Sequence, residues 1–167
     1  MAEHILLDNA QIDRIIDRMS YEFLEENYQY GKAYFGGISG NGVLLAEIFR
    51  NRISSIVKDF KVIPFELSID KKNPINSSQF NIDFPDLIEE PVTLVDDVIN
   101  SGKTMYYALS AFSNYQMNTL QTMVLIKRSH LRFPVKSIIT GVSLSTTLQE
   151  NIEVSLQDRE QKKAILV

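Results

Sequence analysis

Two stretches of this chain share one order: a short apolar segment, a glycine-containing loop and an amphipathic segment. Residues 33–38 predict a buried strand, and a helix is predicted at 43–57 after the loop GISGNG. Residues 91–95 predict a second buried strand, and a helix is predicted at 103–115 after the loop DDVINSG. Strands that alternate with helices favour an α/β fold with a parallel sheet. Both loops would then follow the carboxyl ends of strands, where such sheets bind their ligands.

The rest of the chain predicts one more helix and several strands. Asp8 or Asn9 can cap a helix that carries apolar residues at helical spacing and ends near Gly31. Residues 68–86 are rich in Pro, Asn and Ser, which is typical of a flexible loop or hood. With 167 residues, we expect a single domain over 1–167. Further strands are expected at 61–67 (with Pro64 at an edge or bulge), 120–127 and 136–144, and short closing strands at 152–156 and 164–167.

Charge and composition exclude several classes of protein. The net charge of -4 gives no general attraction to nucleic acid or anionic membranes. The absence of cysteine excludes disulfides, thiolate nucleophiles and cysteine-ligated zinc. No apolar run approaches the roughly 20 residues of a membrane span, and the N-terminus lacks a basic segment typical of a signal peptide. We therefore expect a cytoplasmic protein that does not bind membranes.

The stretch DDVINSGKT, residues 96–104, combines two kinds of ligand-binding group. Asn100, Ser101, Gly102, Lys103 and Thr104 lead into a helix whose first N–H groups favour an anion such as a 5′-phosphate. A Walker A loop would need glycine at Asp97, so a nucleoside triphosphatase is disfavoured. The carboxylates of Asp96 and Asp97 repel phosphate but suit the donor hydroxyls of a ribose. The alternative is that both acids cap a turn and that Lys103 is solvated.

The run TLVDDVINSGKT resembles the phosphoribosyl-pyrophosphate (PRPP) signature of type I phosphoribosyltransferases. Residues 5–27, 37–53 and 124–135 are similar in order and spacing to the pyrimidine-operon regulator and uracil phosphoribosyltransferase group. The resemblance implies a parallel sheet flanked by helices with a small hood. It also implies transfer of ribose 5-phosphate from PRPP to a nucleobase, with release of pyrophosphate. Asp96 and Asp97 are then the catalytic acids, and Mg²⁺ binds with PRPP rather than through side chains.

The first glycine loop matches the pyrophosphate site of that family. Ser39, Gly40, Asn41 and Gly42 can offer backbone N–H groups to an anion. Relatives often place lysine and arginine at the positions of Ser39 and Asn41, and this chain has neither, which weakens stabilisation of the leaving pyrophosphate. The alternative is a tight turn that packs a helix against a strand.

Residues that follow the later strands are candidates for reading the nucleobase. By the same resemblance these are Lys127, Arg128, Leu144 and Ser145. A lysine at position 127 is similar to the 6-oxopurine enzymes, but those enzymes carry an acid at the position of Asn100. The base is therefore a purine or a pyrimidine, and the sequence does not choose between them.

The resemblance also supplies a second hypothesis, a non-catalytic regulator that senses PRPP or a nucleotide. The replacements at Ser39, Asn41 and Asn100 favour it. RNA binding is a further alternative that the negative net charge does not favour; its basic candidates are Arg18, Arg128, His130, Arg132 and Lys136. A homodimer is expected because relatives usually form dimers.

Overall fold

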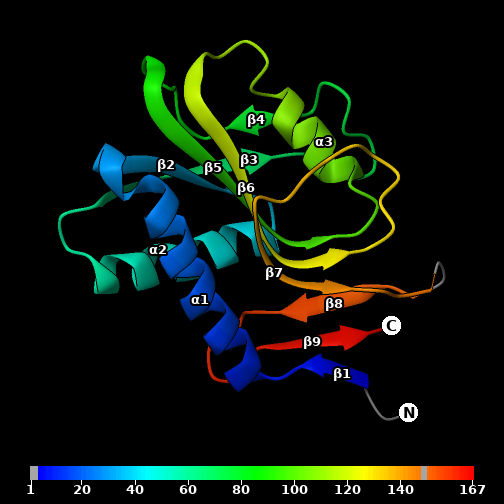
Figure 1. The fold of residues 1–167 in the computed structure, drawn as a ribbon. Coiled ribbons are helices and arrows are strands. Elements are labelled where there is room, and N and C mark those ends of the chain that lie inside the picture. Colours follow the sequence, from blue (N-terminus) through cyan, green and yellow to red (C-terminus); the bar gives the residue numbers. More distant parts are fainter. Residues whose placement is uncertain (1–3, 148–149) are drawn as a thin grey trace.

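A six-stranded sheet forms the centre of the computed structural model, which describes residues 4–147 and 150–167 (Figure 1). The order is β4-β3-β2-β5-β6-β7, and every neighbouring pair is parallel except β3 and β4. This arrangement confirms the predicted α/β fold with a parallel central sheet. The strands are β2 (Lys32–Ile38), β3 (Lys61–Ser68), β4 (Gln79–Phe80), β5 (Leu87–Ile99), β6 (Met117–Arg128) and β7 (Ile139–Leu144).

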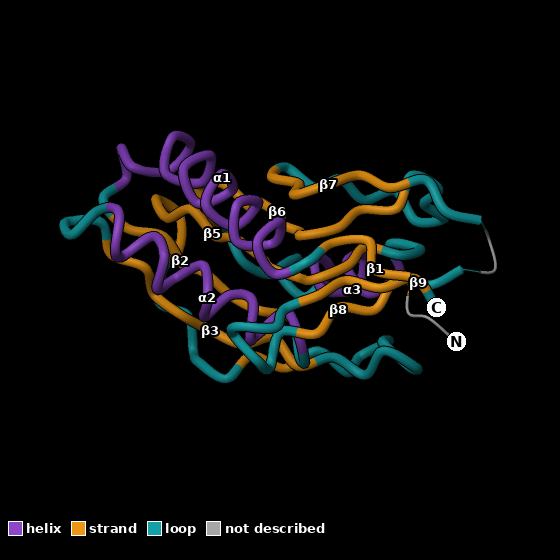
Figure 2. The backbone as a smooth tube through the Cα atoms, turned by 90° about the horizontal axis from the view of Figure 1, so that it is seen from below, coloured by secondary structure: helices purple, strands orange, loops and turns teal. Residues whose placement is uncertain are grey.

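Helices cover both faces of this sheet. Helices α1 (Asn9–Asn27) and α2 (Asn41–Ile56) lie side by side on one face, and α3 (Lys103–Ser110) lies on the other (Figures 1 and 2). Side chains alternate along a strand, so neighbours such as Leu94 and Val95 belong to different apolar cores. Within the described residues, no helix is both long enough and apolar enough to cross a membrane.

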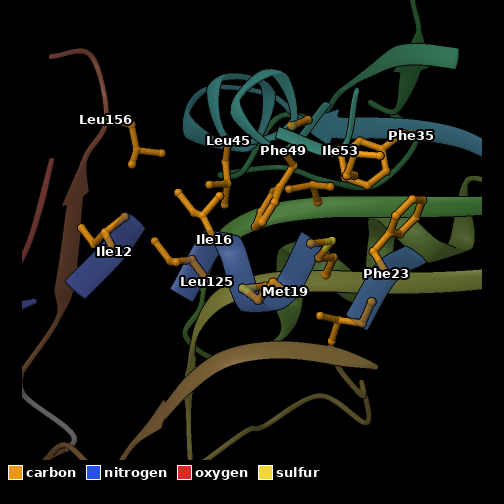
Figure 3. Close-up of a cluster of buried hydrophobic side chains, with 14 of the residues drawn as sticks. Ile12, Ile16, Met19, Phe23, Phe35, Leu45, Phe49, Ile53, Leu125 and Leu156 are labelled. Carbon is orange, nitrogen blue, oxygen red and sulfur yellow. The ribbon is translucent and has the colours of Figure 1, made fainter. Parts of the chain in front are cut away.

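The larger core joins α1 to α2 (Figure 3). Phe23 of α1 packs edge-to-face against Phe35 of β2, with ring centroids 5.1 Å apart. Because α2 begins directly after the first glycine loop, this core fixes where the helix begins relative to the strand ends. The fully buried side chains that join the two helices are Ile12, Met19, Phe23, Leu45, Phe49 and Ile53.

The start of α1 is capped as the sequence predicts. The Gln11 backbone N–H donates to Asp8 Oδ1 at 2.8 Å, and the Asp8 N–H donates to Gln11 Oε1 at 2.9 Å. This reciprocal capping box stabilises a helix start. A 3-10 turn, Tyr28–Tyr30, follows α1, and Gly31 ends it with a left-handed φ of 72°.

Strand β3 tolerates Pro64 because of how it is paired. Its partner β4 pairs only with Leu67 and Ser68. The side of β3 away from β2 is therefore open at Pro64, which has no N–H to donate. The predicted edge position is confirmed.

Several predicted boundaries were wrong. Strand β5 begins at Leu87 instead of residue 91, β6 at Met117 instead of residue 120, and α2 at Asn41 instead of residue 43. Strand β5 runs on to Ile99 instead of ending at residue 95, because β6 continues to pair with it beyond Asp96. Helix α3 ends at Ser110 instead of residue 115, and tighter i→i−3 bonds such as Phe112 N–H to Leu109 O follow it. Strand β7 begins at Ile139 instead of residue 136.

The two closing strands do not extend the central sheet. They are β8 (Ile152–Ser155) and β9 (Lys163–Leu166), which form a separate antiparallel sheet with β1 (His4–Leu7) in the order β1-β9-β8 (Figure 1). The sequence did not indicate β1, whose four residues are too few to show a clear period. We call these three strands the small sheet.

The segment 68–86, predicted as a loop or hood, has two parts. Its later part contains β4 and places Phe80 and Phe84 in the aromatic cluster beside α3, with ring centroids 4.9 Å apart. Its earlier part, residues 70–78, is mostly exposed and has no regular structure. Movement of this earlier part stays a prediction.

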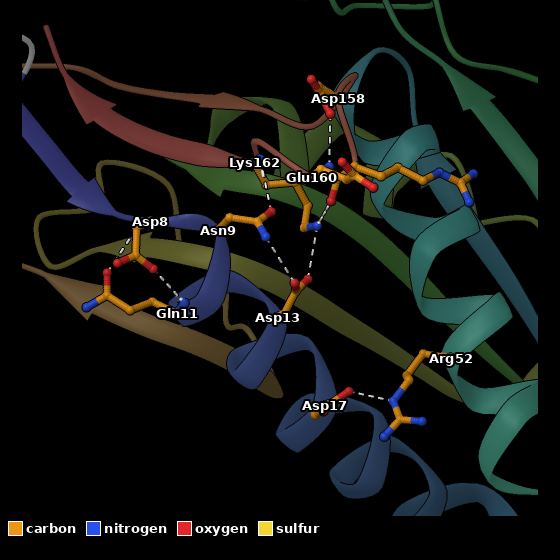
Figure 4. A network of polar contacts seen from close by, with 10 residues as sticks. Asp8, Asn9, Gln11, Asp13, Asp17, Arg52, Asp158, Glu160 and Lys162 are labelled. Atoms are coloured by element: carbon orange, nitrogen blue, oxygen red, sulfur yellow. Dashed lines mark hydrogen bonds and ion pairs between the residues drawn. The ribbon is translucent and has the colours of Figure 1, made fainter.

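Ion pairs attach the small sheet to the helices (Figure 4). Lys162, just before β9, is 5% exposed, and its Nζ lies 3.0 Å from Asp13 Oδ1 of α1. Arg159 Nη2 lies 2.9 Å from Glu47 Oε1 of α2. The connection between β8 and β9 is therefore fixed to both helices, and with it the position of β8.

We expect Asp13→Asn to lower the free energy of unfolding by about 1–3 kcal/mol, because it leaves the buried Lys162 ammonium without its carboxylate. Urea denaturation measures the change. The matched control is Asp17→Asn, one turn along α1, whose partner Arg52 is only half-buried; there we expect a loss of at most about 1 kcal/mol. Equal losses in the two variants would contradict the role assigned to Lys162.

Candidate active site

The two adjacent acids lie inside β5, near its carboxyl end, and point in different directions. Asp96 is 3% exposed, and its Oδ1 accepts the Asp97 N–H at 3.0 Å. Asp97 is half-buried, and its Oδ1 accepts the Val98 N–H at 2.9 Å. A Cβ at Gly42 would lie 3.2 Å from Asp96 Oδ1, so the first glycine loop comes close to this acid.

The buried position of Asp96 changes its acidity. Burial raises the pKa of the Asp96 carboxyl well above its usual range, and the nearby Asp97 charge raises this pKa further. The Lys71 ammonium opposes both effects. Asp96 therefore keeps its proton to a higher pH than an exposed aspartate would.

The second glycine loop turns directly into α3. Gly102 has a left-handed φ of 86°, and a Cβ there would lie 2.8 Å from Val135 Cγ2. The loop is supported from behind, because Ser101 O accepts the N–H groups of Arg132 and Phe133 at 2.9 and 3.1 Å. The N–H groups of the first helical turn have no intrahelical partner and so suit an anion.

A cavity of about 400 Å³ joins these parts, a size typical of small-molecule sites. It brings together Asp96, Asp97 and the predicted 5′-phosphate residues Asn100, Ser101, Gly102, Lys103 and Thr104. Lys71 and the small-sheet strand β8 also line it. Neither was predicted as part of the site. The pattern at 152–156 predicted a strand but not that it would lie beside Asp96 and Asp97, and no pattern distinguished Lys71 from the other charged residues of its loop.

The predicted pyrophosphate residues are only partly at this cavity. Of Ser39, Gly40, Asn41 and Gly42, only Asn41 lines it. Ser39 is hydrogen-bonded to β3 and to the residue after it, through its N–H to Leu67 O at 2.9 Å and its Oγ, which accepts the Ile69 N–H at 3.4 Å. The Asn41 Nδ2 group donates to Asp97 Oδ2 at 2.8 Å and to Val154 O at 2.7 Å. The side chains of Ser39 and Asn41 are thus bonded within the chain.

The predicted nucleobase residues lie beside the phosphate loop but outside the cavity lining. Arg128 at the end of β6 donates to Thr146 Oγ1 at 2.7 Å, to Thr147 O at 2.8 Å and to Asn100 Oδ1 at 3.5 Å. Lys127 pairs with Ser143 of β7, and Leu144 with Arg128. The Ser145 hydroxyl lies 3.1 Å from that of Ser129.

Two of the basic residues considered for RNA binding make contacts within the chain. The Arg128 guanidinium is bound as described above, and Arg18 donates to the carbonyl of Gly141 in β7 and pairs with Glu22. Two of the candidate cations are therefore already bonded within the chain.

Comparison with known proteins identifies the class. Residues 4–159 match the family described as phosphoribosyl transferase domain, and the chain belongs to this family. Family and fold together make it a phosphoribosyltransferase of the predicted type, with an α/β sheet and flanking helices.

Particular relatives match almost the whole chain. This chain is 30% identical in sequence to the protein named "Bifunctional protein PyrR" of Fusobacterium nucleatum, and the match covers 98% of this chain and 96% of that protein. The protein of the same name from Bacillus mycoides is 27% identical over the same shares. These relatives confirm the resemblance to the operon-regulator group.

Solved structures share the fold at low identity. A hypoxanthine-guanine phosphoribosyltransferase of Bacillus anthracis has a TM-score of 0.76 at 11% identity and covers 99% of both chains. A hypoxanthine phosphoribosyltransferase of Trypanosoma cruzi, solved with the product IMP, has a TM-score of 0.75 at 14% identity and covers 99% of this chain and 94% of that one.

The donor set suits Mg²⁺ that arrives with its substrate. The described residues contain no group of three or more His, Asp or Glu that could hold a metal by itself. Mg²⁺ is usually bound through substrate phosphates with few protein ligands. A polar cavity that already contains carboxylates fits that mode of binding.

We expect Asp96→Asn to raise the free energy of unfolding at neutral pH, because it removes a carboxyl that burial keeps from ionising. A raised pKa in the folded state means that stability is complete below the unfolded pKa and falls as the pH rises toward the folded pKa. The gain over wild type should therefore be small near pH 4 and larger near pH 8. Urea denaturation at several pH values measures it. A gain that does not change with pH would contradict the role of burial.

Proposed function

We propose that the protein transfers ribose 5-phosphate from PRPP to a nucleobase and releases pyrophosphate. One observation carries this proposal: a single cavity holds the twin acids of β5 beside the start of α3. An acceptor for sugar hydroxyls and an anion site next to it match the two ends of a ribose 5-phosphate.

Each part of the cavity has a role in this proposal. Asp97 accepts ribose hydroxyls, and residues 100–104 hold the 5′-phosphate through amides, hydroxyls and the Lys103 charge. The charge of Asp97 also stabilises the positive charge that develops on the ribose when its bond to pyrophosphate breaks. Asp96 lies behind Asp97 and contacts the sugar from the buried side. Residues 39–42 then bind pyrophosphate through backbone N–H groups, because the Ser39 and Asn41 side chains are bonded elsewhere.

Lys71 is our candidate for the missing cation of the pyrophosphate site. It lines the cavity from residues 70–78, close enough for its charge to lower the pKa of Asp96 against the effect of burial. When PRPP is bound, this segment can close over it and exclude water. Mg²⁺ bound to the PRPP phosphates would neutralise further charge on the leaving group.

The nucleobase end combines predicted and new groups. Lys127, Arg128, Leu144 and Ser145 stay the proposed side-chain contacts, and Arg128 links them to Asn100. Strand β8 adds its backbone. Asn151 and Val167 exchange both hydrogen bonds, so alternation turns the N–H and C=O groups of Ile152 and Val154 away from β9. These groups suit the polar edge of a purine or a pyrimidine.

We also propose a cytoplasmic homodimer. The location rests on the absence of cysteine, and the dimer on the behaviour of relatives and on exposed aromatic side chains such as Tyr21 and Tyr106. Sedimentation of the purified protein tests the dimer.

The function is tested by incubating the protein with PRPP, Mg²⁺ and each of uracil, hypoxanthine, guanine, xanthine and adenine. Pyrophosphate release that depends on one base supports the transferase and names the base. The alternative is a regulator that senses PRPP or a nucleotide, which the bonded side chains of Ser39 and Asn41 favour. It predicts tight nucleotide binding with no release for any base.

We expect Lys71→Ala to raise the Kd for PRPP about ten-fold, because it removes a positive charge beside the pyrophosphate. Isothermal titration calorimetry measures the Kd. Lys72→Ala is the matched control, since Lys72 is the exposed neighbour that does not line the cavity. Equal effects of the two substitutions would indicate general attraction by the loop and would contradict a specific role for Lys71.

A further inference from the structure

We propose that Asn41 is a positioning residue, which orients Asp97 for the sugar and fastens β8 against the cavity. The proposal rests on the proposed function for its link to PRPP. It assigns Asn41 a role other than the side-chain contact to pyrophosphate expected from the sequence.

The first argument is that the Asn41 side-chain amide has only two hydrogens to donate. An asparagine amide has two N–H hydrogens, and both have acceptors here, Asp97 Oδ2 at 2.8 Å and Val154 O at 2.7 Å. The side chain has no donor left for another anion. A contact from Asn41 to pyrophosphate would have to come from its backbone.

The second argument concerns the carboxylate of Asp97. Its Oδ1 is held by the Val98 N–H and its Oδ2 by Asn41, so both oxygens are fixed in direction. Each oxygen keeps a further lone pair that can accept a ribose hydroxyl. Because the amide is neutral, it orients Asp97 without cancelling the negative charge. A lysine at this position would orient the same group and neutralise it.

The third argument is the free edge of the small sheet. Strand β8 is at the end of the order β1-β9-β8, and within residues 4–147 and 150–167 no strand pairs with its outer side. Val154 O belongs to that outer side by the alternation described above, and Asn41 supplies its hydrogen bond. The connection that follows the same strand is fixed through Arg159 and Lys162. Asn41 is thus the attachment of β8 itself to the active site.

The test compares Asn41→Ala, Asn41→Asp and the control Asn51→Ala, an exposed asparagine of the same helix. For Asn41→Ala we expect a rise of about ten-fold in the Kd for PRPP, because a hydrogen bond to a charged group is lost. Hydrogen exchange should also accelerate about ten-fold at the Glu153 and Ser155 amides, which point toward β9, and stay unchanged at β2 and β5. Asn51→Ala should change neither quantity.

Asn41→Asp separates positioning from simple packing. At about pH 8 the introduced carboxylate repels Asp97 and cannot donate, so PRPP should bind at least as weakly as in Asn41→Ala. Because two carboxylates in contact raise the pKa of the pair, part of the introduced carboxyl carries a proton at about pH 5.5 and can donate it, so the affinity relative to wild type should partly recover. Asn41→Ala should show no such recovery. The other charged groups that line the cavity around this point, and that both variants share, are Lys71, Asp96, Asp97, Lys103 and Glu153.

The outcomes distinguish this inference from the proposed function. Two results overturn the positioning role. One is unchanged hydrogen exchange in β8 of Asn41→Ala. The other is a Kd for PRPP, relative to wild type, that is the same for Asn41→Ala and Asn41→Asp at both pH values. Wild-type protein that binds no PRPP overturns the proposed function, together with the orienting of Asp97 for a sugar. The exchange measurement would still report the attachment of β8 in that case.

Discussion

The parallel pairing of β5 with β2 and β6 is the interaction on which the rest of the site depends. It brings the ends of β2 and β5, and therefore both glycine loops, to the same edge of the sheet. It also carries β5 beyond its apolar stretch, so that Asp96 and Asp97 are held by a strand instead of a loop. Because strand side chains alternate, one acid is buried beside Gly42 and the other faces the cavity.

The small sheet adds a further wall to the site at that edge. Its strand β8 forms a wall of the cavity, although more than 50 residues separate it from the acids in sequence. Ion pairs to α1 and α2 hold the connection that follows β8, and the Asn41 amide holds β8 itself at Val154. The side chains of Ser39 and Asn41, where the sequence resemblance led us to expect cations, have partners within the chain, and Lys71 and Lys103 line the cavity.

Much of the central architecture could be predicted because it depends on local patterns. Apolar strands, glycine loops and an Asp8 cap are visible over a few residues, and the cluster at 96–104 carries its chemistry in one run. The boundaries of β5 and α3 could not be predicted, since β6 prolongs the first and a run of tight turns ends the second. Strand β1 has too few residues to show a period, and its pairing with β9 joins opposite ends of the chain.

The sequence by itself determined the fold class and the family, because the strands, the glycine loops and the run 96–104 are continuous segments with their own physical signatures. Only the tertiary structure decided which groups share the cavity. The partners of Asn41 are Asp97 and Val154, which are 56 and 113 residues away, and no local pattern encodes a hydrogen bond across such separations. The burial that raises the pKa of Asp96 likewise comes from the packing of several elements around it.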